Sequence, residues 1–332
     1  ANANVARFVQ ISAVGADARD PSPFLSTKAM ADNALRASAL DWSILRPGLV
    51  IGRNAYGGTL LVRALAALPW AVFTVHGAAR VRTVALSDVA EAVRQCLALS
   101  SGQRIDADLV ERPDHSLRNL ILRHRAWLGI APPRFIADLT AGLARVTGLL
   151  ADMLGQLGWR SPLRSTAMQM VARDIDGDPE AGETLLGRPL LTLDQTLAAN
   201  PSGLQDRWQA RLFLLLPAMV GSLALLFLLS GIVSLARLDQ VTVQLDGTLL
   251  AGRPALLLGI LGALADIALG AAILIRRWAR RAALGMALLS AAYLAMGSWV
   301  RPDMWVDPLA PLAKAVTALV LALVAYVLLE ER

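Results

Sequence analysis

Four long, almost uncharged stretches near the C-terminus limit most strongly what this chain can fold into. They cover roughly residues 212–236, 255–275, 282–300 and 309–329. A helix needs about 20 apolar residues to cross the hydrocarbon core of a bilayer. A buried helix of a soluble protein can imitate one such stretch, but four in succession, joined by short polar turns, are hard to explain in water. The pattern therefore predicts an all-α bundle of four transmembrane helices.

The composition indicates two regions with different solvents. Hydrophobic residues make up 55% of the 332 residues, above the roughly 45–50% that is usual for soluble domains. The excess lies in the four stretches, whereas residues 1–200 mix charged and apolar positions. The net charge of +6 does not indicate nucleic-acid binding, because the arginines are scattered and do not alternate with stacking aromatics.

Cysteine and histidine usage predicts a region without metal in a reducing compartment. Cys96 is the single cysteine of the sequence, so an intrachain disulfide is excluded. His76, His115 and His124 show no metal-ligand spacing with Cys96 or with one another.

Arginines in the short loops predict the orientation of the spans. The stretch "RRWARR" (276–281) joins the second span to the third, and Arg207 and Arg211 precede the first span. The other two loops mix arginines with aspartates. Because positively charged loops stay in the cytoplasm, we expect a multi-pass protein of the inner (cytoplasmic) membrane whose globular region and C-terminus face the cytoplasm.

Asp266 lies near the middle of the second span. A carboxylate at that depth costs about 2.5 to 3.5 kcal/mol on insertion scales, so it should face the bundle and find a polar partner. Two interpretations stay open, an interhelical hydrogen bond that holds the bundle together and a proton or quinone site. The candidate partners are Ser230, Ser290, Tyr293 and Thr317.

The globular region alternates predicted strands and helices, which is typical of a parallel α/β sheet. We expect Asp88 to cap the last of these helices, with Glu91 completing a box-like pair. The segments are residues 7–15 (strand), 24–40 (helix), 41–52 (strand) and 79–99 (strand, then helix).

Four motifs of this region carry a resemblance to a known family. They are a strand that ends in "ISA", the helical "STKAMAD" with a "YxxxK"-like spacing, the strand "DWSILRPGLVIG" and the later "SDVAEAV". Together they make residues 7 to about 110 similar to the second half of the Rossmann domain of short-chain dehydrogenases/reductases, in the atypical or extended NAD(P)-binding branch. The blocks "SLRNLILRHRAWLGI" and "LGRPLLTLDQTLAANP" resemble the substrate-side segment of that group. The four spans resemble a DoxX-like membrane domain.

The resemblance implies the fold class and the division of the chain. We expect the C-terminal half of a Rossmann-like parallel α/β sheet, followed by the all-α four-helix transmembrane bundle. The expected domains are residues 1–110 (second half of the NAD(P)-binding domain), 111–205 (substrate-side helical segment and linker) and 206–332 (transmembrane domain).

The resemblance also implies site residues and a cofactor, NAD or NADP. In that family a serine orients the substrate, a tyrosine transfers a proton, and a lysine lowers the pKa of the tyrosine and bonds the nicotinamide ribose. By position, Ser12 matches the serine and Lys28 the lysine, which makes both candidate catalytic residues. The candidate cofactor-binding residues are Lys28, Pro47, Gly48 and Val50.

The chain departs from the family pattern at the tyrosine. Four residues before Lys28 stands Phe24, which has no proton to give. Ser22, Ser26 and Thr27 are poor substitutes, because an unassisted hydroxyl has a far higher pKa than a phenol. The proton-transfer step of the family is therefore in question for this chain.

A second departure is that this sequence lacks the glycine-rich turn, which binds the pyrophosphate in dinucleotide-binding folds. Gly48, Gly52, Gly57 and Gly58 do not replace it, because they follow a later strand. A sheet that starts at a late strand would present a long apolar edge. We therefore expect the full gene product to carry such a turn upstream of Ala1, in preference to a chain that has lost half of its fold.

These observations predict a membrane-anchored, NAD(P)-binding oxidoreductase or epimerase-like protein. Its expected partners are the lipid bilayer and a small-molecule substrate or quinone, without nucleic acid. One alternative is a non-catalytic dinucleotide-binding or assembly subunit of a membrane complex, similar to the accessory subunit of respiratory complex I that uses this fold. Another places the activity in the DoxX-like bundle, with Asp266 at its centre.

Overall fold

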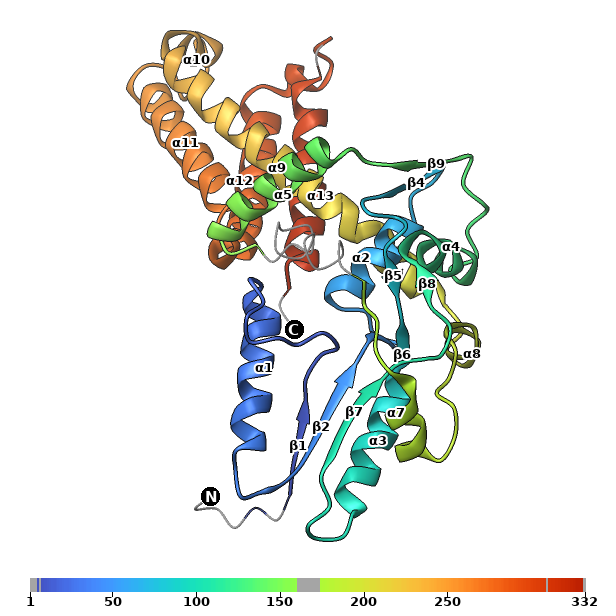
Figure 1. The fold of residues 1–332 in the computed structure, drawn as a ribbon. Helices are drawn as coiled ribbons and strands as arrows, with labels where there is room; N and C mark the ends of the chain where they lie inside the picture. Colours follow the sequence, from blue (N-terminus) through green and yellow to red (C-terminus); the bar gives the residue numbers. More distant parts are fainter. Residues whose placement is uncertain (1–4, 6, 160–173, 309, 331–332) are drawn as a thin grey trace. The chain divides into compact units, whose positions relative to one another are not determined.

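The computed structural model describes residues 5, 7–159, 174–308 and 310–330 (Figure 1). It separates into two units, an N-terminal unit of residues 1–152 and 161–211 and a C-terminal unit of residues 153–160 and 212–332. The N-terminal unit mixes helices with short, mostly parallel sheets, and the C-terminal unit is helical. This confirms the expected class, a parallel α/β region followed by an all-α region with four apolar helices.

A three-stranded parallel sheet lies in the N-terminal unit. Its strands, in sheet order, are β1 (Arg7–Ile11), β2 (Asp41–Pro47) and β7 (Ile105–Leu109). The register places Ile11 opposite Leu45. Helix α1 (Pro23–Arg36) connects β1 to β2, as neighbouring parallel strands require a crossover. Among the described strands, β1 pairs with β2 alone.

Strand β2 buries different side chains on its two faces. Trp42 and Ile44 pack with α1. Leu45 packs with α3 (Leu86–Ala98), in the core that also contains Cys96. Because successive side chains of a strand point to opposite faces, this central strand is covered by a helix on each side, as in doubly wound α/β folds.

The single strand expected over residues 41–52 is in fact two strands that belong to different sheets. After β2 the chain turns at Gly48, and β3 (Leu49–Ile51) pairs in parallel with β6 (Thr83–Ala85). A Cβ atom at Gly48 would lie 2.6 Å from the carbonyl oxygen of Arg82. The break between β2 and β3 therefore depends on the close approach of the backbone at Gly48 to the backbone at Arg82, which a residue without a Cβ atom permits.

The cap expected of Asp88 is wrong. Helix α3 has Ala85 at its N-cap, with no side-chain cap hydrogen bond. The buried carboxylate of Asp88 instead accepts hydrogen bonds from Nη2 of Arg188 at 2.6 Å and from the backbone N–H of Leu191 at 2.7 Å. A guanidinium and a backbone N–H satisfy both oxygens of a buried acid, which a local cap would not.

A second core of the N-terminal unit joins α2, α4 and α8. Strands β4 and β9 pair in parallel, and β5 and β8 form a short antiparallel ladder. The bounds of these elements are α2 (Gly57–Ala66), β4 (Ala71–Thr74), β5 (Arg80–Val81), β8 (His115–Ser116), α4 (Leu117–Trp127), β9 (Phe135–Asp138), α7 (Pro179–Leu186) and α8 (Leu193–Ala199).

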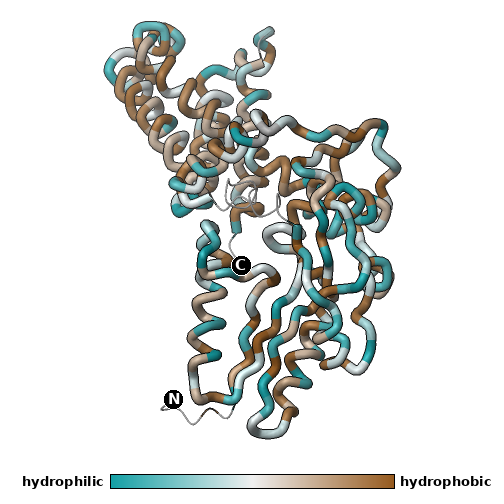
Figure 2. Tube along the Cα trace, in the orientation of Figure 1, coloured by the Kyte–Doolittle hydropathy of each residue, from teal (hydrophilic) through white to brown (hydrophobic). Residues whose placement is uncertain are grey.

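Four helices of the structure are long and apolar enough to cross a membrane, as the sequence predicted. They are α9 (Leu204–Ala236), α11 (Arg253–Ala272), α12 (Arg276–Val300) and α13 (Pro311–Leu328). Figure 2 shows their predominantly brown, hydrophobic colouring. A short helix α10 (Leu238–Gln244) and a 3-10 turn (Pro302–Trp305) lie between them, and helix α5 (Ala141–Gln156) precedes them in the chain.

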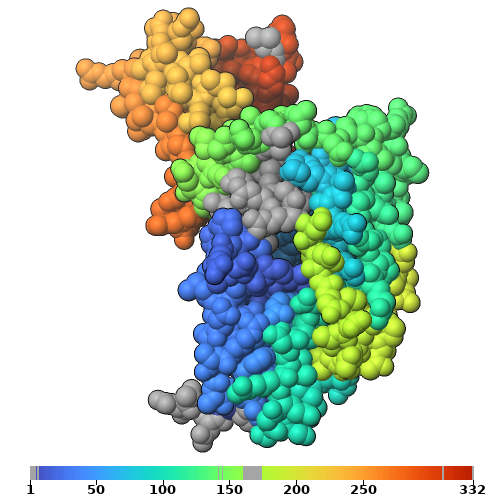
Figure 3. Space-filling view, in the orientation of Figure 1, coloured from blue at the N-terminus to red at the C-terminus, as the bar shows by residue number. Residues whose placement is uncertain are grey.

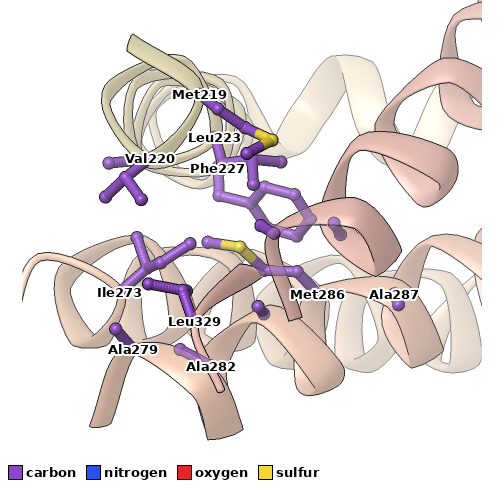
Figure 4. Packing of buried hydrophobic residues seen from close by; sticks show 14 residues of the cluster. Met219, Val220, Leu223, Phe227, Ile273, Ala279, Ala282, Met286, Ala287 and Leu329 are labelled. Atoms are coloured by element: carbon purple, nitrogen blue, oxygen red, sulfur yellow. The ribbon is translucent and has the colours of Figure 1, made fainter. Parts of the chain in front are cut away.

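Small side chains bring the bundle helices close together. Met219, Leu223 and Phe227 of α9 meet Met286 of α12 in the core shown in Figure 4. Alanines let neighbouring membrane helices approach closely, which strengthens dispersion contacts where the hydrophobic effect is weak. The buried alanines of this core are Ala224, Ala279, Ala282, Ala283, Ala287, Ala322 and Ala325.

Polar contacts identify the two ends of the bundle. At one end, Nη2 of Arg276 donates to the carbonyl oxygen of Leu329 at 3.3 Å, so the arginine-rich start of α12 lies beside the end of α13. At the other end, Nη1 of Arg301 donates to the carbonyl oxygen of Gln244 at 2.5 Å. The stretch 276–281 and the end of α13 therefore lie at the same end of the bundle. This is expected, because two antiparallel helices, α12 and α13, separate them in the chain.

Candidate functional site

Ser12 follows β1 directly, at the carboxyl end of the sheet. Its backbone N–H donates to the carbonyl oxygen of Leu45 at 2.8 Å, which continues the β1–β2 ladder. Its buried hydroxyl donates to Oδ2 of Asp32 on α1, at 2.7 Å. Strand end and helix are thus joined by a buried, charge-assisted hydrogen bond.

Lys28 lies one helical turn before Asp32 on α1. Its Nζ donates to the carbonyl oxygen of Ile11, the last residue of β1, at 2.7 Å. An ammonium group has three donors. In the described part of the structure this is its one hydrogen bond and it forms no ion pair, so two donors remain for a ligand. Ser12 and Lys28, the two candidate catalytic residues, are therefore both held at the end of β1, and their catalytic role stays a prediction.

Asp32 is a member of this cluster that sequence reasoning missed. Its Oδ2 also lies 3.6 Å from Nε of Arg46 on β2. Its Oδ1 is buried and has no hydrogen-bond partner among the described residues. The signal was present in the sequence, because a carboxylate stood on the same helical face as the buried Leu25 and Ala29.

Arg46 links Asp32 to two carboxylates of β7. Its Nη2 lies 2.5 Å from Oδ1 of Asp106, and its Nη1 lies 3.2 Å from Oδ1 of Asp108. Burial lowers the pKa of Arg46, but the two carboxylates of β7 outweigh burial and leave that pKa raised. The guanidinium is therefore a fixed cation that balances the negative charge around the buried serine–aspartate pair.

The residues of this cluster can bind and position a ligand, but they supply no acid for proton transfer. Ser12 donates its proton to Asp32, so its hydroxyl can accept but not donate toward a ligand. Phe24 is 48% exposed and lies one turn before Lys28, where it offers no proton donor. Gly15, in the loop after Ser12, has a positive φ of 75° and open space where a Cβ would stand. Lys28 is thus the side chain of this cluster that can donate hydrogen bonds to a ligand, at the end of β1 and beside the loop that follows it.

The other predicted cofactor residues have packing contacts of their own. The carbonyl oxygen of Pro47 accepts a hydrogen bond from the N–H of Val14 at 3.4 Å. Gly48 approaches Arg82, as described above, and the half-buried Val50 packs against the core beneath α3. The structure brings Pro47 beside the loop after Ser12, whereas Gly48 and Val50 face other neighbours. Their cofactor role stays a prediction.

Asp266 of α11 contacts two of its predicted partners. Ser230 of α9 donates to Oδ2 at 2.8 Å, and Tyr293 of α12 donates to Oδ1 at 3.3 Å. Thr317 bonds the carbonyl oxygen of Ala313 in its own helix instead. Asp266 therefore connects three helices, and its two partners satisfy a carboxylate that is buried among apolar helices. Its interpretation as a proton or quinone site stays a prediction.

Two families match different parts of the chain. Residues 1–99 match the NAD(P)H-binding family, and residues 224–323 match the DoxX-like family. The chain thus carries an NAD(P)-binding domain at its N-terminus and a DoxX-like domain at its C-terminus, as the sequence motifs indicated. No curated protein matches the chain.

Solved structures of several enzymes are similar to part of this chain. A nucleoside-diphosphate-sugar epimerase from Staphylococcus aureus has 16% identity and a TM-score of 0.43, over 58% of this chain and 64% of the epimerase. An NADPH-dependent quinone oxidoreductase from Escherichia coli has 17% identity and a TM-score of 0.44, over 60% and 68%. A triphenylmethane reductase from Citrobacter sp., complexed with NADP(H), has 15% identity and a TM-score of 0.44, over 60% and 66%. The chain spans slightly less than two thirds of the epimerase.

Proposed function

We propose that this chain, which joins an NAD(P)-binding domain to a DoxX-like domain, is a membrane-anchored oxidoreductase-like protein that holds NAD or NADP at the carboxyl end of β1. The observation that carries the proposal is the position of Lys28. Its ammonium is fixed on the strand end by Ile11 and keeps two donors free. In open parallel sheets, ligands bind outside the carboxyl ends of the strands.

The free donors of Lys28 suit the hydroxyls of a ribose. Two hydroxyls on neighbouring carbons can each accept a hydrogen bond from one ammonium group. Asp32, through Ser12 and Arg46, keeps the end of β1 and helix α1 in a fixed relation. When bound, the nicotinamide supplies hydride chemistry.

We expect Lys28→Ala to weaken binding of NAD or NADP by roughly ten- to a hundredfold, because a charge-assisted hydrogen bond contributes about 1.5 to 3 kcal/mol. Lys28→Arg should not restore affinity, since a planar fork differs in reach from a compact ammonium. The measurement is calorimetric titration of both cofactors into the protein expressed from its complete coding sequence. Lys314→Ala, which removes the chain's other lysine on α13, is the matched control. Parent-like affinity of Lys28→Ala would refute the role of Lys28.

A non-catalytic cofactor-binding or assembly subunit is the second candidate, and Phe24 favours it. A phenyl ring in place of a phenol leaves the lysine without an acid to activate. Phe24→Tyr separates the two candidates, because the exposed ring can take a hydroxyl without disturbing the core. Binding should stay unchanged in either case. Turnover that appears or rises in this variant favours an enzyme, and its absence with a panel of carbonyl and quinone substrates favours the subunit.

The membrane arrangement belongs to the same proposal. The DoxX-like domain and four apolar helices support membrane association. We propose further that the protein lies in the inner membrane, with the NAD(P)-binding domain on the cytoplasmic side and a small-molecule substrate or quinone as its partner. The arginines of the 276–281 stretch support this orientation.

A further inference from the structure

Helix α5 exposes a broad apolar face. Its large apolar side chains are each at least 40% exposed, although the helix lies outside the four apolar spans. At 100° per residue they occupy a continuous arc of about 140°. In Figure 3, atoms of α5, coloured green, lie at the surface of the face shown. The side chains of this apolar arc are Leu143, Val146, Leu149, Leu150, Met153 and Leu154, with Leu157 just beyond the helix.

The remaining faces of α5 differ in kind. Gly148 and Ala151, on the side away from the apolar arc, are buried. Arg145 and Gln156 are exposed and form a polar edge beside the arc. A soluble protein rarely leaves a contiguous apolar patch of this kind in water. A helix with one apolar arc and one polar edge is instead suited to an interface between lipid and water.

The length of α5 excludes a span. Its 16 residues measure about 24 Å at 1.5 Å per residue, whereas the hydrocarbon core is about 30 Å thick. Arg145 would also have to enter that core. The exposed arc is therefore suited to the membrane surface and not to a crossing of the bilayer.

The segment after α5 is fixed to one end of the bundle. The N–H of Arg276 donates to the carbonyl oxygen of Leu157 at 2.9 Å, and Nε1 of Trp159 donates to the carbonyl oxygen of Leu274 at 2.6 Å. Trp159 also packs against the bundle core, with the Arg276 guanidinium 5.6 Å from its ring centre. Residues 153–160 belong to the C-terminal unit. Leu157 and Trp159 contact the rest of this unit at the turn between α11 and α12, where the two proposed spans meet.

We propose that α5 is an interfacial helix, which inserts its apolar arc among the lipid acyl chains on the arginine-rich side of the bilayer. The inference rests on the proposal that the four helices span a membrane. Continuity with the ends of α11 and α12 places the C-terminal end of α5 at the level of the headgroups, and the tryptophan at position 159 is typical of that level. Arg145 on the polar edge, together with the arginines at 276–281, suits anionic headgroups.

Spin labels on single cysteines test this placement in the whole protein in nanodiscs that contain anionic lipid. Leu143→Cys and Leu150→Cys report on the apolar arc, and Arg145→Cys and Gln156→Cys report on the polar edge. Oxygen concentrates in the lipid, whereas a water-soluble nickel chelate stays in the water. The rates at which the two reagents collide with a spin label therefore give the depth of that label in the bilayer. The native Cys96 is fully buried and burial raises the pKa of its thiol, so the unmodified protein gives the labelling background. Val320→Cys, on the exposed face of α13, is the lipid control.

We expect labels on the apolar arc to resemble the Val320 label, with frequent oxygen and rare nickel collisions, and labels on the polar edge to show the opposite. Equal nickel access on both faces would overturn the interfacial helix. Protection of the arc from both reagents would also overturn it, because a second copy or another protein would then cover the arc. If the Val320 label itself meets nickel freely, the proposed spans fail, which is distinguishable from a failure of α5 alone.

Discussion

At the residue scale, the N-terminal unit keeps a neutral histidine beside a buried arginine. His124 of α4 is fully buried, and its Nδ1 lies 2.8 Å from the carbonyl oxygen of Leu120. Arg63 of α2 is buried next to it, with its guanidinium 4.6 Å from the ring centre of Trp127. Burial and, to a smaller extent, the charge of Arg63 lower the pKa of His124 to about 4, although its bond to Leu120 opposes the shift.

This histidine makes the stability of the N-terminal unit depend on pH. The unfolded chain takes up a proton at His124 near pH 6.5, whereas the folded protein does so only near pH 4. The stabilisation is therefore complete above pH 6.5 and is lost as the pH falls toward 4. Between pH 6.5 and 5 the loss is about 2 kcal/mol, which corresponds to a decrease of roughly 4 to 8 °C in the melting temperature of a unit of this size.

Thermal unfolding of the protein at pH 7.5, 6 and 5 measures this effect. His124→Gln should flatten the pH dependence, because a neutral amide takes up no proton in either state. His76→Asn is the control, since His76 is exposed and its positive φ of 56° suits asparagine. An identical pH dependence in the His124→Gln variant would show that other groups control acid stability.

At the element scale, the contact between α9 and α11 depends on glycine. A Cβ atom at Gly231 of α9 would lie 2.5 Å from the carbonyl oxygen of Ala263 and 2.7 Å from Cγ1 of Ile267. A Cβ atom at Gly270 of α11 would lie 2.9 Å from the backbone nitrogen of Leu228. Each of these helices therefore presents a bare backbone to the other, which is how membrane helices pack most closely.

We expect Gly231→Ala to destabilise the bundle by about 1 to 3 kcal/mol, because the methyl group forces two backbones apart. Gly221→Ala in the same helix is the matched control, since open space surrounds its added Cβ. It should be neutral or slightly stabilising, as alanine favours helix. Unfolding of both variants in mild detergent, followed by the loss of helical circular dichroism, measures the difference. Equal stability of the two variants would contradict the close contact between α9 and α11.

At the scale of the whole molecule, the proposed orientation makes the two ends of the bundle chemically different. Trp278 lies within the arginine-rich stretch, and Arg277 and Arg281 stack on its ring. Asp303 lies at the opposite end of the bundle, near the contact between Arg301 and Gln244. An impermeant thiol reagent added outside intact cells should label Asp303→Cys and miss Trp278→Cys. The reverse pattern would place the NAD(P)-binding domain outside the cytoplasm.

The sequence by itself determined the elements whose causes are local. A span is recognisable because lipid obliges each helix to satisfy its own backbone and to be apolar along its length, so the signal lies within about 20 neighbouring residues. The parallel α/β class followed for the same reason, since buried strands and amphipathic helices alternate visibly along the chain. The candidate role of Lys28 came from the resemblance of its helix to a family motif, and it stays a prediction.

Contacts between distant segments were decided only by the tertiary structure. Asp88 has the sequence pattern of a cap, yet it bonds Arg188 and Leu191, about a hundred residues away. Asp32 resembles an ordinary helix residue until the fold brings Ser12 and Arg46 to it. A buried carboxylate takes the strongest donors within reach, and which donors those are depends on how the strands and helices meet, which a local pattern does not encode.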